Sequence, residues 1–337
     1  MESLKNKIDF AVIINVKRAN PNGDPLNGNR PRVDYDGYGE ISDVCIKRKI
    51  RNRLMEAGHK IFVQSDDNRV DEYRSLRDRA KNELKDVYKN LFKKPKKKGE
   101  KDQEQKPTGS KGSDDIFRNE ACNRWIDVRA FGQVFAFGGD DGKDESQNPT
   151  EGVDQKEKET KGKEKGVSIG VRGPVSIHPA FSVAPVNYRV SSQQIIKSVN
   201  LEKPGPEKAS DTMGMKHRVD HGLYVSYGAI NPQLASKTWF KDEDAKAIKN
   251  ALEHLLDNDA SSARPEGSME VVAVIWWEHN RNNGQYSSAV VHRSLDVDLK
   301  KEGTDPKKIE DYSIKLKSLD GLTPEIFNPN NVDIERI

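Results

Sequence analysis

Two short, largely apolar runs that contain several β-branched residues constrain the fold of this chain most strongly. They occupy residues 10–16 (FAVIINV) and 269–277 (MEVVAVIWW), near opposite ends of the sequence. Neither run alternates with polar residues, and both are too short for a typical helix, so each is typical of a strand buried on both faces. We therefore predict two buried strands contributed by distant parts of the sequence.

Helical periodicity marks the segments next to these strands. Ser42 predicts a helix N-cap, followed by apolar residues at helical spacing, and Gly58 suits the end of that helix. Residues 71–92 and 242–256 are also predicted to be helical. The apolar stripe of the first helix is Ile46, Ile50, Leu54 and Ala57, and that of the last is Ala245, Ile248, Leu252 and Leu255.

Further strands are predicted at 167–190 (broken at Gly173, Pro174 and Pro185), 221–229, 288–292 and 312–316. The order strand, helix, strands, helix, strand resembles a ferredoxin-like βαββαβ core with large insertions. The predicted fold class is therefore α+β.

Two polar tracts account for much of the skewed composition, in which 33% of residues are charged and 34% hydrophobic. Residues 93–115 and 138–166 contain almost nothing apolar and are expected to be disordered insertions, because they bury too little surface to offset their ordering entropy. Between them, residues 122–137 (CNRWIDVRAFGQVFAF) are dense in aromatic side chains and are expected to pack.

Several functional classes lack support in the sequence. Cys45 and Cys122 are the only cysteines, which is too few for a disulfide framework or a zinc site. The sequence has no Walker loop, dinucleotide-binding fingerprint or nucleophile elbow. No apolar run has the length of a membrane span. We expect a soluble cytoplasmic protein without membrane contact, metal or cofactor.

A cluster of cations on the first predicted helix indicates an anion-binding surface. Lys47, Arg48, Lys49, Arg51 and Arg53 crowd this helix, although cations near a helix N-terminus oppose its dipole. An anion lying across that end would compensate, because backbone N–H groups and cations would face it together. The alternative is a solvated helix face; the nearby Arg30 and Arg32 favour anion binding.

Residues 20–39 (NPNGDPLNGNRPRVDYDGYG) are predicted to form a long loop. Its backbone N–H groups and side-chain amides could follow a sugar–phosphate backbone without reading bases. Asp34 and Asp36 could hold a divalent metal, but Asx residues in such a segment usually make turns.

Residues 210–222 (SDTMGMKHRVDHG) combine methionines with cations. Met213 or Met215 could wedge between bases while Lys216, His217 and Arg218 hold phosphates. The alternative is a methionine that fills a gap in the core. No third ligand joins His217 and His221, so no metal site is assigned.

Arg264 lies in a polar turn before the second buried strand. It could contact phosphate, but pairing with a carboxylate of the preceding helix is the favoured interpretation.

The chain resembles the Cas-seven family of CRISPR Cascade backbone subunits, most closely its type I-C branch. The matching segments occur in the order of the family and are residues 18–52, 125–137, 169–177, 211–225 and 257–269. This resemblance implies a right-hand shape, with an RRM-like palm, helical fingers and a thumb β-hairpin. The implied boundaries are palm 1–60, fingers 61–166, palm strands 167–190, thumb 191–221 and palm completion 222–337.

The resemblance also implies a function and a set of binding residues. The subunits would polymerise as a helical filament along a crRNA guide, displace bases at regular intervals and support pairing with target DNA, without catalysis. Other Cascade subunits and a recruited nuclease–helicase would be further partners. The expected RNA-binding residues are Arg18, Asn20, Asn22, Arg30, Ser42, Lys47, Arg48, Arg51, Arg172, Met213, Lys216, His217, Arg218 and Arg264.

Two alternative functions remain open at this point. Relatives in type III systems cut RNA with an aspartate in the loop before the palm helix, where this chain has Asp24 and Asp34. The other alternative is an RRM-like protein that binds cellular RNA by itself as a monomer.

Overall fold

The computed structural model describes residues 2–92, 111–138, 166–186, 190–196 and 213–337. Its largest feature is an antiparallel sheet with β1 (Ile8–Ala19) near its middle. β10 (Met213–Ile230) and β11 (Met269–Glu278) flank β1. The outer strands are β14 (Glu325–Phe327) on β11; β7 (Val175–Ile177), β8 (Ala180–Pro185) and β9 (Val190–Ile196) on β10; and β4 (Tyr38–Ile41) on β8.

Side chains on the two faces of β1 enter different cores, which confirms that this strand is buried on both faces. Phe10, Val12 and Ile14 pack in the core on the helical side, whereas Ala11 and Ile13 pack on the opposite side. The helical side is covered by α1 (Asp43–Glu56), α5 (Ile126–Phe131), α6 (Pro232–Thr238) and α7 (Asp242–Glu253).

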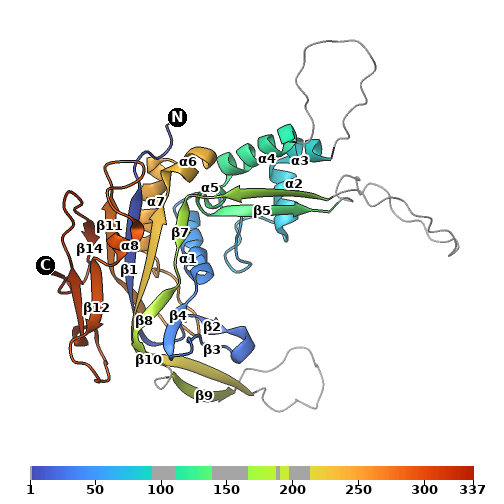
Figure 1. Cartoon of the computed structure of the whole chain (residues 1–337). Coiled ribbons are helices and arrows are strands. Elements are labelled where there is room, and N and C mark those ends of the chain that lie inside the picture. Colours follow the sequence, from blue (N-terminus) through green and yellow to red (C-terminus); the bar gives the residue numbers. More distant parts are fainter. Residues whose placement is uncertain (1, 93–110, 139–165, 187–189, 197–212) are drawn as a thin grey trace, which may run out of the picture.

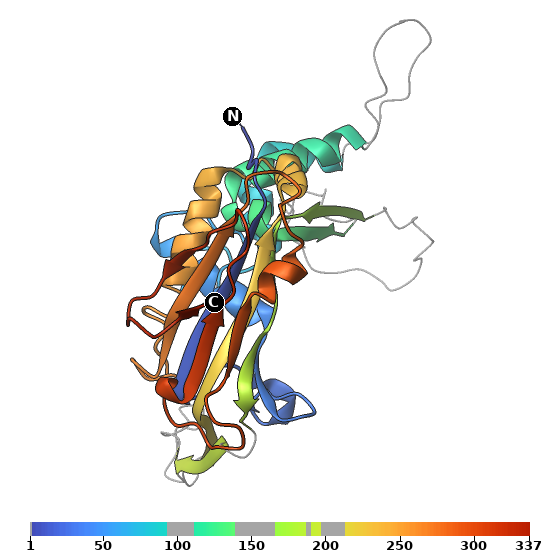
Figure 2. The same cartoon turned by 60° about the vertical axis from the view of Figure 1, so that its left-hand side comes forward.

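The opposite face is covered by a smaller sheet, visible in Figure 2 in front of the main one. It comprises β12 (Leu295–Leu299), β13 (Tyr312–Leu316) and β15 (Glu335–Arg336), preceded by α8 (Ser288–His292). Two-sided packing explains why neither buried strand alternates between apolar and polar residues.

A second packed unit projects from the sheet (Figure 1). It comprises α2 (Leu76–Glu83), α3 (Lys85–Leu91), α4 (Lys111–Arg124) and a ribbon of β5 (Gly132–Phe137) with β6 (Val167–Arg172). Its own core is rich in aromatic rings, including Phe62, Tyr88, Phe117, Phe135 and Phe137. The predicted packing of residues 122–137 is confirmed.

Several sequence-based predictions need correction. Residues 288–292 form α8 rather than a strand, because a short apolar run does not distinguish the two. The predicted helix at 71–92 is two short helices, divided at Leu84. Residues 111–115 of the first polar tract begin α4. Ala57 is exposed rather than part of the buried stripe. The remainder of that tract and residues 139–165 of the second lie outside the described residues.

No helix in the described part of the chain is long and apolar enough to cross a membrane.

Gly228 illustrates how closely the central strands approach their neighbours. A Cβ atom there would lie 2.1 Å from Cζ of Phe10 and 2.6 Å from the carbonyl oxygen of Ser176. We expect Gly228→Ala to lower the free energy of unfolding by about 1–3 kcal/mol through overpacking. Chemical denaturation measures this loss. Gly170→Ala is the control, because a Cβ on that strand residue would have no atom within 4 Å, and an equal loss there would contradict the steric explanation.

A buried polar network fixes the beginning of β1 to the segment after β11. Asp9 Oδ2 accepts a hydrogen bond from His279 Nε2 at 2.8 Å and lies 3.0 Å from Lys7 Nζ. The amide of Gln285 donates to His279 Nδ1 at 2.9 Å, so Nε2 carries the ring proton. Burial raises the pKa of Asp9, but hydrogen bonds from His279, Ser288 and Lys7 outweigh it and hold the pKa below 3.8.

His292 makes this region sensitive to pH. Its Nε2 donates to the carbonyl oxygen of Gly228 at 3.1 Å, and burial is the main cause that lowers its pKa from 6.5. The unfolded chain therefore takes up this proton first, so stability is lost as pH falls through the unfolded pKa. The ionisable groups that face the ring are Asp9, Lys7, His178 and Tyr227.

We expect the thermal midpoint of the wild type to decrease as the pH is lowered from about 7.5 to 5.5. In His292→Gln, the slope of thermal midpoint against pH should be shallower. Thermal unfolding at several pH values measures both slopes. His254→Gln, which changes an exposed histidine, should leave the wild-type slope intact. An unchanged slope in His292→Gln would show that other groups dominate.

Candidate nucleic-acid interface

The N-terminus of α1 is fixed to the long loop by a pair of polar side chains. Ser42 Oγ accepts from the amide of Cys45 at 3.3 Å, which confirms the predicted N-cap. Asn22 Oδ1 in turn accepts from both the amide and the hydroxyl of Ser42, at 2.9 and 2.8 Å. The loop and the first turn of the basic helix therefore form one connected unit.

The five cations of α1 separate into an outward and an inward group. Lys47 and Arg48 are the more outward pair, with side chains 24% and 58% exposed. Lys47 bonds Asp43 within the same helix at 2.9 Å, and Arg48 lies 3.3 Å from the exposed Asp67. Lys49, Arg51 and Arg53 are inward. Lys49 pairs with Asp259, Arg51 with Asp127 and Arg53 with Glu56.

Asp127 is a buried carboxylate with three donors. Its oxygens accept from Arg51 Nε at 3.0 Å and from the amides of Phe62 and Val63 at 2.7 and 3.0 Å. The Arg51 guanidinium also lies 5.1 Å from the centre of the Phe131 ring. The structure thus gives Arg51 internal partners on α5, and Asp127 links them to the segment of Phe62 and Val63. The sequence pattern did not indicate these contacts.

The long loop contains a two-residue ribbon, β2 (Gly23–Asp24) paired with β3 (Arg30–Pro31), around the 3₁₀ turn η1 (Pro25–Asn27). Asn20 is buried; its Nδ2 donates to the carbonyl oxygen of Asn29 at 2.8 Å.

The aspartates of this loop have local roles. Asp24 accepts from the amide of Leu26 at 3.2 Å and lies 3.6 Å from an Arg32 nitrogen. Asp34 accepts from the amides of Asp36 and Tyr38 at 3.0 and 2.8 Å. Among the described residues no group of three His, Cys, Asp or Glu side chains could hold a metal ion.

β9 and the first part of β10 form a hairpin at one end of the molecule (Figure 1). Met215 and His217 lie on one face, because residues two apart on a strand share a face, whereas Lys216 and Arg218 lie on the other. Met215 is 55% exposed. The side chain of Met213 lies outside the described residues.

Ser192 on β9 connects this hairpin to the long loop. Its Oγ accepts from an Arg30 nitrogen at 3.2 Å and lies 2.8 Å from Nδ1 of His217, its partner across the hairpin. Burial and the nearby Arg30 charge lower the pKa of His217. On the other face, Arg218 Nε donates to Ser191 Oγ at 3.0 Å. The structure therefore brings Arg30, Ser192 and His217 together.

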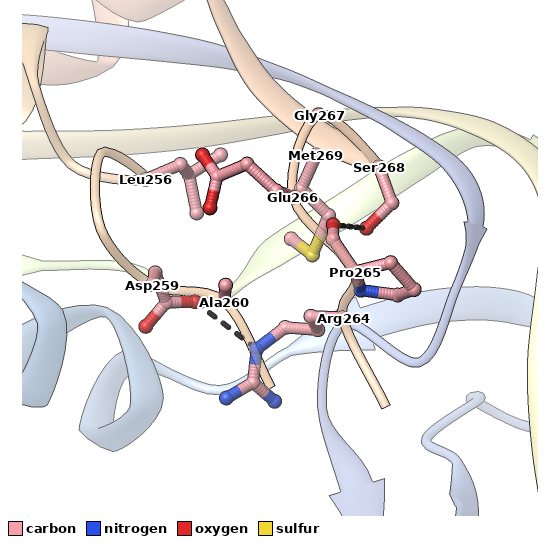
Figure 3. Close-up of a pocket in the computed structure, with 9 residues that line it drawn as sticks. All are labelled: Leu256, Asp259, Ala260, Arg264, Pro265, Glu266, Gly267, Ser268 and Met269. Atoms are coloured by element: carbon pink, nitrogen blue, oxygen red, sulfur yellow. Dashed lines mark hydrogen bonds and ion pairs between the residues drawn. The ribbon is translucent and has the colours of Figure 1, made fainter. Parts of the chain in front are cut away.

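Arg264 lies in the turn between α7 and β11, where its Nε donates to Asp259 Oδ2 at 3.0 Å (Figure 3). Pairing with a carboxylate is confirmed, although Asp259 follows α7 rather than belonging to it. The amide of Asn20 donates to the carbonyl oxygen of Ala263 at 2.9 Å. The turn is therefore attached to the start of the long loop, and Lys49 brings α1 to the same carboxylate.

Two other predicted binding residues lie on different elements. Arg18 is exposed near the end of β1 and has a φ of 55°, a left-handed conformation that is uncommon for arginine. Arg172 is exposed at the end of β6 in the projecting unit, opposite Gly132 in the ribbon.

This fold and these surfaces define a mixed α+β protein with an antiparallel main sheet and outward cations on several elements. A family model described as CRISPR-associated protein Cas7 matches residues 6–317. The chain belongs to the Cas7 family.

A curated relative, "CRISPR-associated protein Cas7" of Haloferax volcanii, is 23% identical over 263 residues. The match covers 76% of this chain and 66% of the relative, slightly less than two thirds of its length. A solved chain titled "CRISPR RNA-guided surveillance complex, pre-nicking" aligns with 98% of this chain and 96% of its own, at 15% identity and a TM-score of 0.49. Another, titled "CRISPR RNA-guided surveillance complex", has 13% identity and a TM-score of 0.39, with 98% and 94% coverage.

Proposed function

We propose that this chain is a non-catalytic, crRNA-binding backbone subunit of a type I CRISPR surveillance complex, of the type I-C branch. The observation that carries the proposal is the outward pair Lys47 and Arg48 on a helix whose N-terminus is locked to a glycine- and asparagine-rich loop. Such a surface binds phosphates without reading bases. Membership of the Cas7 family supports this choice.

The palm, in this proposal, is a ferredoxin-like core of residues 1–60, 167–190 and 222–337. The strand order β11-β1-β10-β8, with α1 and α7 packed in the core on one side, supports it. The projecting unit would be the fingers (61–166), and the β9–β10 hairpin would belong to the thumb (191–221), whose residues 197–212 lie outside the described part.

The proposed contacts with the guide fall into two groups. Lys47, Arg48, Arg30, Lys216 and Arg218 would hold phosphates, while the exposed Met215 would be a wedge at displaced bases. Arg51 keeps its internal partners and would support the helix instead of binding RNA. Because the same contacts recur in every copy along one guide, modest contacts would add up to a high overall affinity. Base pairing between the guide and DNA would then select the target.

The alternative of an RNA-cutting backbone subunit is not favoured by any contact in the described loop. Asp24 and Asp34 both serve as local acceptors that stabilise turns. We therefore propose no catalysis by this chain.

Expression with and without a CRISPR array tests the proposal. With the array, we expect long assemblies that carry one size class of guide RNA; without it, these assemblies should be lost. A monomer that carries mixed cellular RNA in both cases would overturn the proposal. Incubation of the assembly with complementary RNA and Mg²⁺ tests the alternative, because regularly spaced cleavage that Asp24→Ala or Asp34→Ala abolishes would show catalysis.

A further inference from the structure

One carboxylate oxygen, Asp259 Oδ2, binds two cations from different parts of the chain. Lys49 Nζ reaches it from α1, and Arg264 Nε reaches it from the turn before β11 at 3.0 Å. The two cations differ in their access to solvent, since the Lys49 side chain is 5% exposed and that of Arg264 27%. The cluster thus has one internal and one outward cation.

Lys49 is buried and forms its ion pair inside the protein. Burial lowers its pKa, and the nearby Asp259 charge is the largest effect in the opposite direction. A buried ammonium group needs such a counter-ion, because water no longer stabilises its charge. Lys49 therefore has little capacity to contact an external anion, despite its place in the basic cluster.

Arg264 has the opposite arrangement. Its Nε is occupied by Asp259, and no partner to either terminal Nη nitrogen occurs in the part of the chain that the structure describes. In Figure 3 the two terminal nitrogens point away from Asp259 and from the other labelled residues. A guanidinium held at Nε still presents two parallel donors, which suit the two oxygens of a phosphate.

The backbone around this guanidinium is also fixed. Ser261 and Arg264 exchange two backbone hydrogen bonds, at 2.8 and 3.0 Å, and the amide of Lys17 donates to the carbonyl oxygen of Ser268 at 2.8 Å. A side chain on a fixed turn, held by a carboxylate, loses little freedom when it binds a ligand.

We propose that Asp259 is a positioning residue for RNA binding. It neutralises Lys49 inside the protein and aims the outward edge of Arg264 at a backbone phosphate of the guide. This inference depends on the proposed RNA-binding function and deepens it. It has an unusual consequence: a carboxylate close to a polyanion should weaken binding by simple charge repulsion, whereas here its removal should weaken binding.

Three variants with guide-RNA affinity measured against salt concentration test this inference. Lys49→Met should bind RNA within about twofold of the wild type and with an unchanged salt slope. Arg264→Gln should bind about tenfold more weakly, with the salt slope reduced by about 0.7. The double variant Asp259→Ala with Lys49→Met keeps the wild-type net charge, leaves no buried lysine unpaired and removes the acceptor of Arg264 Nε; we expect it to lose affinity as Arg264→Gln does.

Wild-type affinity in the charge-matched double variant would overturn the positioning role. Equal losses in Lys49→Met and Arg264→Gln would also overturn it, and this comparison remains decisive if the double variant fails to fold by circular dichroism. Failure of the proposed function would give a different result. In that case RNA binding would be unchanged both in Arg264→Gln and in the variant with Lys47 and Arg48 changed to alanine. Dependence on Lys47 and Arg48 without dependence on Arg264 would contradict this inference alone.

Discussion

Replacing Asp127 with alanine should lower the free energy of unfolding by about 3–5 kcal/mol. The carboxylate is 1% exposed and receives hydrogen bonds from Arg51 and from the amides of Phe62 and Val63. Its removal leaves a largely buried guanidinium and two amides without their acceptor, and an unmatched buried charge is among the most destabilising changes in a protein. Urea or guanidinium denaturation measures the loss.

Asp67→Ala is the matched control for this prediction. Asp67 also pairs with an arginine of α1, Arg48, but that pair is exposed, with a nitrogen–oxygen distance of 3.3 Å. Exposed pairs contribute about 0–1 kcal/mol, so this variant should unfold close to the wild type. If both variants lost the same stability, the distinction between inward and outward cations on α1 would fail.

Changing Lys47 and Arg48 together to alanine should weaken RNA binding about 10- to 100-fold for an isolated site, and more for an assembly in which the loss recurs in every copy. The loss should be the same for all RNA sequences, because phosphate contacts carry no base information. Two lost phosphate contacts should also reduce the slope of log affinity against log salt by about 1.4 for single-stranded RNA.

The control for this variant changes Lys300 and Lys301 to alanine, which removes the same charge. These exposed residues lie next to β12, in the smaller sheet that covers the face of the main sheet opposite the helices. We expect little change in its affinity and salt slope. Equal weakening in both double variants would show that total charge, rather than the α1 surface, controls binding.

Local patterns predicted the elements of this fold better than they predicted the partners of its charges. The two buried strands and the Ser42 cap follow from residues within each segment. In contrast, Lys49 and Arg51 resemble Lys47 and Arg48 in sequence, and their partners Asp259 and Asp127 lie 210 and 76 residues away. Only tertiary packing separates the inward from the outward cations.

Short elements were also difficult to predict. The apolar run at 288–292 suits a strand or a helix equally. In the structure it forms the short helix α8, whose Val291 packs in the core between the main sheet and the smaller sheet. The role of Asp259 has no local signature at all, because its two cations come from separate elements.

The position of β1 between β10 and β11 has a consequence for synthesis on the ribosome. Ile8 pairs with Ile230 on one side and with Glu278 on the other. At roughly 5–20 residues per second, the first strand would wait on the order of tens of seconds for its neighbours, with apolar side chains and unpaired edges accessible throughout. The nascent chain should therefore depend on chaperones until β11 has been synthesised, and fast overexpression should favour aggregation over assembly.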